Sequence, residues 1–79
     1  MKPDNICDDY SKKGVKLDIQ VREDTVFIEG DKKSLEFLGN LILAQAEFKS
    51  DTSFHIGPTG PGSIFFNKTA SFGIYINRK

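Results

Sequence analysis

With 79 residues, of which 38% are hydrophobic and 28% charged, the chain has room for one globular domain and is too apolar to be disordered. Eleven basic and eleven acidic residues cancel, which argues against a nucleic-acid partner. The one cysteine excludes an internal disulfide, and no apolar run approaches the ~20 residues of a membrane span. Because no signal peptide follows Met1 either, we expect a cytoplasmic protein without membrane contact.

Residues 1–14 show neither a helical nor a strand period. Pro3, several acidic residues and the Lys12-Lys13-Gly14 run make this stretch polar. It is typical of a flexible N-terminal arm, so we place the single α+β domain at residues 15–79.

The segment Val15–Arg22 alternates strictly between apolar and polar residues, which predicts a half-buried strand. A second strand follows at Thr25–Glu29, and the Glu23-Asp24 pair between them predicts a tight turn in which Asp24 takes the left-handed conformation. Phe27 falls on the outer face of this hairpin. The inner face is predicted to carry Val15, Leu17, Ile19, Val21, Val26 and Ile28.

The segment from Asp31 to Phe48 is the only one with a sustained helical period. Asp31 is placed to cap the helix, and Gly39 predicts a close approach of helix to sheet. Leu43 is isolated on the polar side, where it is a candidate anchor for a partner. The core-facing positions are Leu35, Leu38, Leu41, Ile42 and Gln45, with the Gln45 amide satisfied by loop backbone.

Three further strands are predicted after the helix, at Ser53–Ile56, Ser63–Asn67 and Ser71–Asn77, with the loop Gly57–Gly62 between the first two. The element order is therefore ββαβββ. We expect an α+β fold in which an antiparallel sheet of about five strands carries one helix packed on one face.

No catalytic, metal or cofactor motif accompanies this pattern. The Gly57–Gly62 loop has glycines five residues apart but lacks the lysine of a phosphate-binding loop. His55 is the only histidine, and no spacing pairs it with a nucleophile or with metal ligands. We therefore expect no cofactor, no bound metal and no enzymatic activity, although a small ligand-binding domain or enzyme that uses His55 stays open as the less favoured alternative.

The outer face of the sheet is the predicted contact surface. Phe27, His55, Phe65 and Tyr75 all fall there, where an uncovered sheet face is normally polar. Apolar, aromatic patches of this kind are typical of binding or dimer surfaces. The stiff loop around Pro58 and Thr59 can extend the surface. The alternative is that the N-terminal arm covers the patch with Ile6 and Tyr10.

Several segments together resemble the small immunity proteins of bacterial polymorphic toxin systems, most nearly the group called immunity protein 32. They are Leu17-x-Ile19, Val26-x-Ile28-x-Gly30-Asp31, Ser34-Leu35-x-x-Leu38-x-x-Leu41-x-Leu43-x-x-Ala46-Glu47, Phe54-His55-Ile56-Gly57-Pro58 and a strand pair around Ser71. The resemblance implies a non-enzymatic antitoxin that binds a cognate toxin domain and neutralises it. The alternative is a small homodimeric structural or interaction domain.

Overall fold

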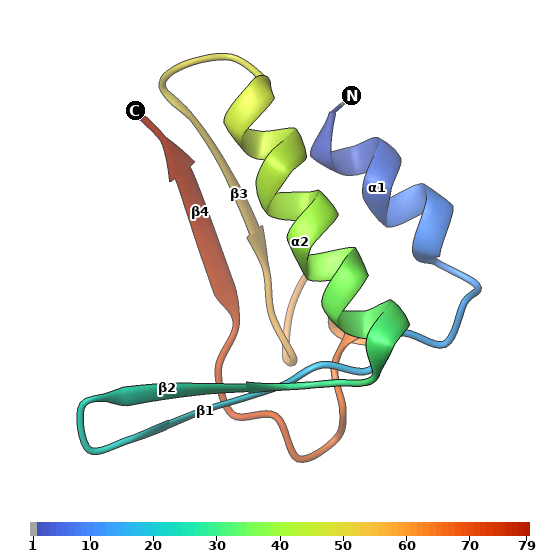
Figure 1. Ribbon diagram of the computed structural model, residues 1–79, viewed down its shortest axis with the longest axis vertical. Coiled ribbons are helices and arrows are strands. Elements are labelled where there is room, and N and C mark those ends of the chain that lie inside the picture. Colours follow the sequence, from blue (N-terminus) through green and yellow to red (C-terminus); the bar gives the residue numbers. More distant parts are fainter. Residues whose placement is uncertain (1) are drawn as a thin grey trace.

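The computed structural model describes residues 2–79 and confirms the α+β class (Figure 1). Its four strands form two separate antiparallel pairs, β1–β2 and β3–β4, so the prediction of one sheet of about five strands is wrong. The elements are α1 (Pro3–Tyr10), β1 (Asp18–Arg22), β2 (Thr25–Glu29), α2 (Lys32–Glu47), β3 (Thr52–Ile56), the 3-10 turn η1 (Ser63–Phe65) and β4 (Ile74–Arg78).

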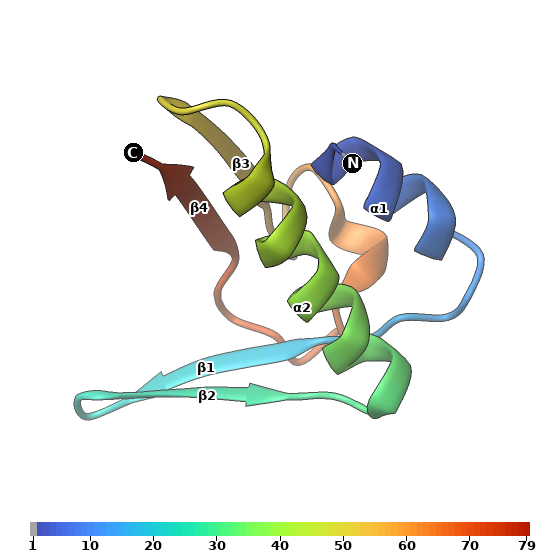
Figure 2. The same cartoon turned by 45° about the horizontal axis from the view of Figure 1, so that its top comes forward.

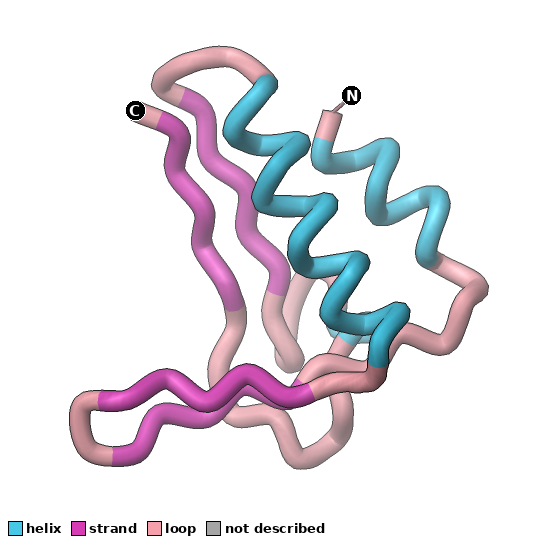
Figure 3. The backbone as a smooth tube through the Cα atoms, in the orientation of Figure 1, coloured by secondary structure: helices cyan, strands magenta, loops and turns pink. Residues whose placement is uncertain are grey.

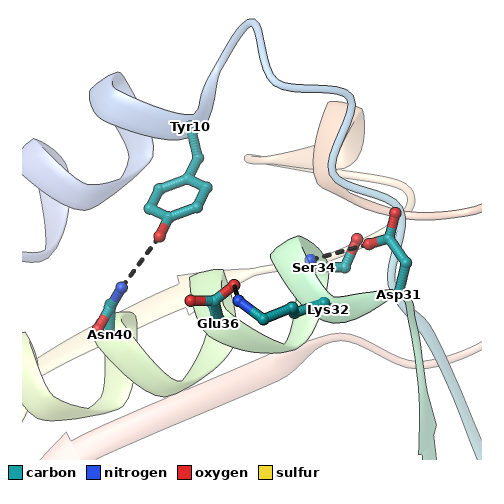
Figure 4. Close-up of polar contacts among 6 residues, drawn as sticks. All are labelled: Tyr10, Asp31, Lys32, Ser34, Glu36 and Asn40. Atoms are coloured by element: carbon teal, nitrogen blue, oxygen red, sulfur yellow. Dashed lines mark hydrogen bonds and ion pairs between the residues drawn. The ribbon is translucent and has the colours of Figure 1, made fainter.

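Helix α2 forms as its sequence predicts. The carboxylate of Asp31 accepts a hydrogen bond of 2.9 Å from the backbone N–H of Ser34, which satisfies one of the free donors of the first turn (Figure 4). Lys32 and Glu36, which are one turn apart on the exposed side of the helix, form an ion pair of 2.9 Å. The cap therefore fixes where the chain leaves β2 and turns into the helix.

The buried face of α2 is narrower than predicted. Leu38 and Leu41 are buried, and the buried Gln45 donates its amide to the Thr52 carbonyl at 2.7 Å, as expected. Leu35 and Ile42, however, are about half exposed. Gly39 also has nothing within 4 Å of the position its Cβ would take, so it does not mark a close approach.

The predicted flexible arm is wrong for most of its length, because Pro3–Tyr10 is a helix that lies alongside α2 (Figures 1 and 2). Pro3 begins the helix and is buried together with Ile6. The Tyr10 ring lies 5.4 Å from the Phe37 ring, and its hydroxyl accepts a hydrogen bond of 3.0 Å from Asn40 (Figure 4). Ile6 and Tyr10 therefore dock on the helical side of the core, and α1 belongs to the folded domain.

The β1–β2 hairpin projects from the body of the molecule (Figures 1 and 3). Its register pairs Ile19 with Ile28 and Val21 with Val26, so these four side chains share one face as predicted. Only Ile19 is buried, because nothing covers the outer half of the hairpin. At the turn it is Glu23, with φ 58°, that takes the left-handed conformation expected for Asp24.

The strand predicted at Ser63–Asn67 is a 3-10 turn instead. Gly62 enters it with φ 75°, and the N–H groups of Phe65 and Phe66 bond to carbonyls three residues back. Because these groups are satisfied locally, they cannot join a sheet ladder. The turn reverses the predicted orientations: Phe65 is buried and Ile64 is exposed.

Strand β4 begins at Ile74, three residues later than predicted, and pairs with β3 so that His55 lies opposite Tyr75. Phe72, which falls within the predicted strand, lies before β4 and is exposed. The core is centred on the Phe37 ring, which stacks on the Phe65 ring with centroids 4.4 Å apart. The buried apolar residues are Ile6, Val15, Leu17, Ile19, Phe37, Leu38, Leu41, Ala44, Ile56, Phe65 and Phe66.

Candidate protein-binding surface

The predicted aromatic patch does not assemble. Phe65 is only 4% exposed and is part of the core, so its place among the contact residues is a wrong prediction. Phe27 belongs to the β1–β2 hairpin, where the Arg22 guanidinium lies 4.8 Å from its ring. His55 and Tyr75 are the only two members brought together, across β3 and β4 with ring centroids 6.3 Å apart.

The remaining predicted contacts lie apart from that pair. Leu43 is exposed on α2, as its position on the helical wheel predicts. The loop at Pro58 and Thr59 is closed by a hydrogen bond of 2.8 Å from the Gly57 N–H to the Pro61 carbonyl, which makes it compact. Thr59 is exposed and Pro58 is half-buried. The predicted site residues therefore occupy several faces and form no single surface.

Exposed apolar residues lie on one face of the β1–β2 hairpin and on one side of α2, and we call the two sets together the hairpin–helix surface. Its members are between 44% and 58% exposed although each is a large aliphatic residue. On the hairpin they share the face of Ile19, whose burial shows that this face turns toward the body of the molecule. On α2 they lie two turns apart on one side of the helix. The surface consists of Val21, Val26, Ile28, Leu35 and Ile42.

This surface was missed because its residues were assigned to the core. The period of two on the hairpin and the helical period on α2 both agree with the structure. An apolar face, however, was taken to be covered by the same chain. In the structure β2 leads directly into α2, so the two elements meet at one bend of the chain (Figures 1 and 2). Neither apolar face is covered by a further layer in the part of the chain that is described.

A groove of about 530 Å³ lies between α1, β3 and η1. Cys7, Asp4 and Asp8 line it from α1, and His55 and Ile64 line it from the opposite side. Burial, and then the two carboxylates, raise the pKa of the Cys7 thiol to about 11. The thiol is thus protonated at neutral pH, the form that neither attacks carbonyls nor binds metals.

Hydrogen bonds hold the segment before β4 against β1. The Thr69 hydroxyl donates to one Asp18 carboxylate oxygen, and the Gln20 amide donates to the other at 2.9 Å. These two bonds, that from Thr69 first, lower the pKa of Asp18 below its ordinary value. Their effect is structural, because they fix the chain at residue 69 beside the base of the hairpin.

No protein-family model, curated protein or solved structure matches this chain. Within residues 2–79, no three His, Cys, Asp or Glu side chains are grouped as metal ligands would be. None of the helices in that range has the length and hydrophobicity to cross a bilayer. The exposed apolar residues are therefore the feature of this molecule on which a function can be argued.

Proposed function

We propose that this chain is a non-enzymatic immunity protein that binds a toxin domain of the same bacterium and neutralises it. The observation that carries the proposal is the hairpin–helix surface, where large aliphatic side chains are left about half exposed on a small domain. Exposed apolar groups that gather on one face are characteristic of protein-binding surfaces. The resemblance of the sequence to immunity proteins supplies the class of partner.

The surface has the composition of an interface centre with a polar rim. Its own members are all aliphatic, and the hairpin turn at its outer end carries Glu23 and Asp24. Burial of apolar area contributes about 25 cal/mol per Å², and charged groups at the edge favour the correct partner over others. Ile42 is the member best placed as an anchor, since it lies on a rigid helix.

The test is co-expression with the C-terminal toxin domain encoded beside this gene. The unaltered chain should restore growth of cells that make the toxin domain and should co-purify with it. Ile42→Asp should lose protection and weaken binding at least about tenfold, because it places a charge in the buried centre. Ile64→Asp is the matched control, since Ile64 is similarly exposed but lies on η1.

Protection by both variants would contradict the assignment of the surface. Failure of the unaltered chain to bind or protect would contradict the immunity function itself. The His55–Tyr75 pair is the second contact region that we propose, because it keeps an exposed aromatic ring on β4. Tyr75→Ala belongs in the same assay, and a loss of binding there with Ile42→Asp unaffected would move the contact to the outer face of β3–β4.

A further inference from the structure

Strand β2 has one free edge. Its other edge pairs with β1 over the whole strand, whereas on the far edge of β1 the Ile19 carbonyl accepts hydrogen bonds from Ser71 and Phe72. No backbone hydrogen bond outside the β1–β2 ladder involves Thr25–Glu29 within the described residues. An edge strand with unpaired N–H and C=O groups is a template for another strand.

The turn shows which groups point outward. It has two residues, so the flanking pair, Arg22 and Thr25, exchanges both hydrogen bonds, and every second pair along the ladder does the same. Val26 and Ile28 fall on the intervening pairs. Their N–H and C=O groups therefore point away from β1, toward the free edge.

The edge lacks three of the features that normally block strand addition, and its one charge, Glu29, lies at the end of the strand. The sequence of β2 is Thr-Val-Phe-Ile-Glu, without lysine, proline or a bulge, and its ladder with β1 is regular over five pairs. Strand β4, by comparison, ends at Arg78 and is followed by Lys79, two positive charges that oppose close approach of another copy. Strand β2 is thus more open to pairing than β4.

The sequence of β2 is complementary to itself about Phe27. In an antiparallel pair centred there, Val26 of one copy lies opposite Ile28 of the other, and Thr25 lies opposite Glu29, so no two like charges meet. The outward-pointing groups of Val26 and Ile28 then bond to each other across the pair. Phe27 meets Phe27 of the second copy on the opposite face, where aromatic rings pair favourably.

We propose that two copies of this chain form a symmetric dimer by antiparallel pairing of β2 with β2, centred on Phe27. The two hairpins then make one four-stranded sheet in the order β1–β2–β2–β1. This removes an instability of the single chain, because a two-stranded hairpin that projects into water is marginal and a third strand stabilises it. The inference goes beyond the proposed function and does not depend on a toxin.

The test uses the position of residue 27, which lies opposite residue 27 of the second copy in the proposed dimer. In analytical ultracentrifugation the unaltered chain should dimerise with increasing concentration. Phe27→Lys and Phe27→Glu should each dimerise at least about tenfold more weakly, because two like charges then face each other on the axis. Mixing the two variants should restore a dimer with one copy of each. Phe72→Lys, at a similarly exposed phenylalanine outside β2, is the matched control and should dimerise like the unaltered chain.

Cross-linking tests the register. With Cys7 replaced by serine, Phe27→Cys should form a disulfide dimer readily, since directly opposite residues of this type have Cα atoms ~4.5 Å apart. Thr25→Cys should not, because it faces Glu29 and lies ~13 Å from its own copy. A monomeric unaltered chain at high concentration, a Phe27→Lys dimer as strong as the original, or equal cross-linking at both positions would each overturn the proposal.

Discussion

Replacing Phe65 by alanine should strongly destabilise the whole protein rather than merely weaken a contact surface. The ring is 4% exposed and stacks on Phe37 at 4.4 Å, so its removal leaves a cavity at the centre of the core. Losses of about 3–5 kcal/mol are typical of such a change. For 79 residues the whole free energy of unfolding is expected to be about 4–12 kcal/mol, so the variant should lose at least about a quarter of it.

Urea unfolding followed by circular dichroism measures this loss. All variants should be compared at one protein concentration, because dimerisation stabilises the folded chain by mass action. Tyr75→Ala is the control: that ring is 67% exposed, so its loss should change the free energy of unfolding by less than about 0.5 kcal/mol. If Phe65→Ala costs less than about 1 kcal/mol, the ring lies at the surface, and the placement of η1 is wrong.

Three further outcomes are expected. Gly39→Ala should stabilise the protein by about 1 kcal/mol, because residue 39 is helical and has open space around its Cβ position. Gly73→Ala should destabilise the protein, because a Cβ there would lie 2.6 Å from a carbonyl oxygen of β3. Thermal unfolding of the two variants checks both expectations. The hydrogen bond from Thr69 lowers the pKa of Asp18, so the contribution of the Asp18 carboxylate to stability is present above pH ~4 and is lost as the pH falls through the folded pKa. The difference in urea midpoint between the unaltered chain and Asp18→Asn should therefore shrink from pH 7 to pH 3. A constant difference would contradict the hydrogen bond. Cys7, with a pKa of about 11, should react with iodoacetamide at pH 8 at least about tenfold more slowly than a free cysteine, and an equal rate would contradict its burial.

Local sequence was sufficient to predict α2, its cap and the β1–β2 hairpin. The Asp31 cap involves a contact only three residues away, and the alternation in the hairpin reflects a register set by its own short turn. Such features depend on neighbours in sequence, so they can be deduced without the fold. The hydrogen bond of Gln45 was equally accessible, because its partner Thr52 lies just beyond the helix.

The errors concern contacts between distant segments. The helical spacing of Pro3, Ile6, Cys7 and Tyr10 in α1 was missed in the sequence. Eight residues rarely hold a helix in water, so the burial of α1 against α2 decides the outcome. The segment Ser63–Asn67 has strand-like composition, and the local bonds after Gly62 override it. Propensity is a weak guide wherever tertiary packing or a tight turn competes with it.

The candidate site failed for a related reason. The predicted patch required β2, β3, the Ser63–Asn67 segment and β4 to be neighbours in one sheet, and two separate hairpins cannot supply that arrangement. His55 and Tyr75 do lie together, because their contact needs only the β3–β4 pairing. Leu43 was correctly judged exposed from the helical wheel alone.

An alternating apolar pattern indicates that a face is to be covered, but it does not say by which chain. The cover of Ile19 comes from its own chain, whereas Val21 and Val26 on the same face have none. If β2 pairs with a second β2, the face gains Val26 and Ile28 of that copy and becomes a wider surface for a toxin. The two proposals are then thermodynamically linked: a toxin that binds the doubled face more tightly must strengthen the dimer by the same factor. Phe27→Lys distinguishes the two proposals, because residue 27 lies on the face opposite to Val26 and Ile28. The variant should therefore weaken toxin binding only to the extent that it weakens the dimer.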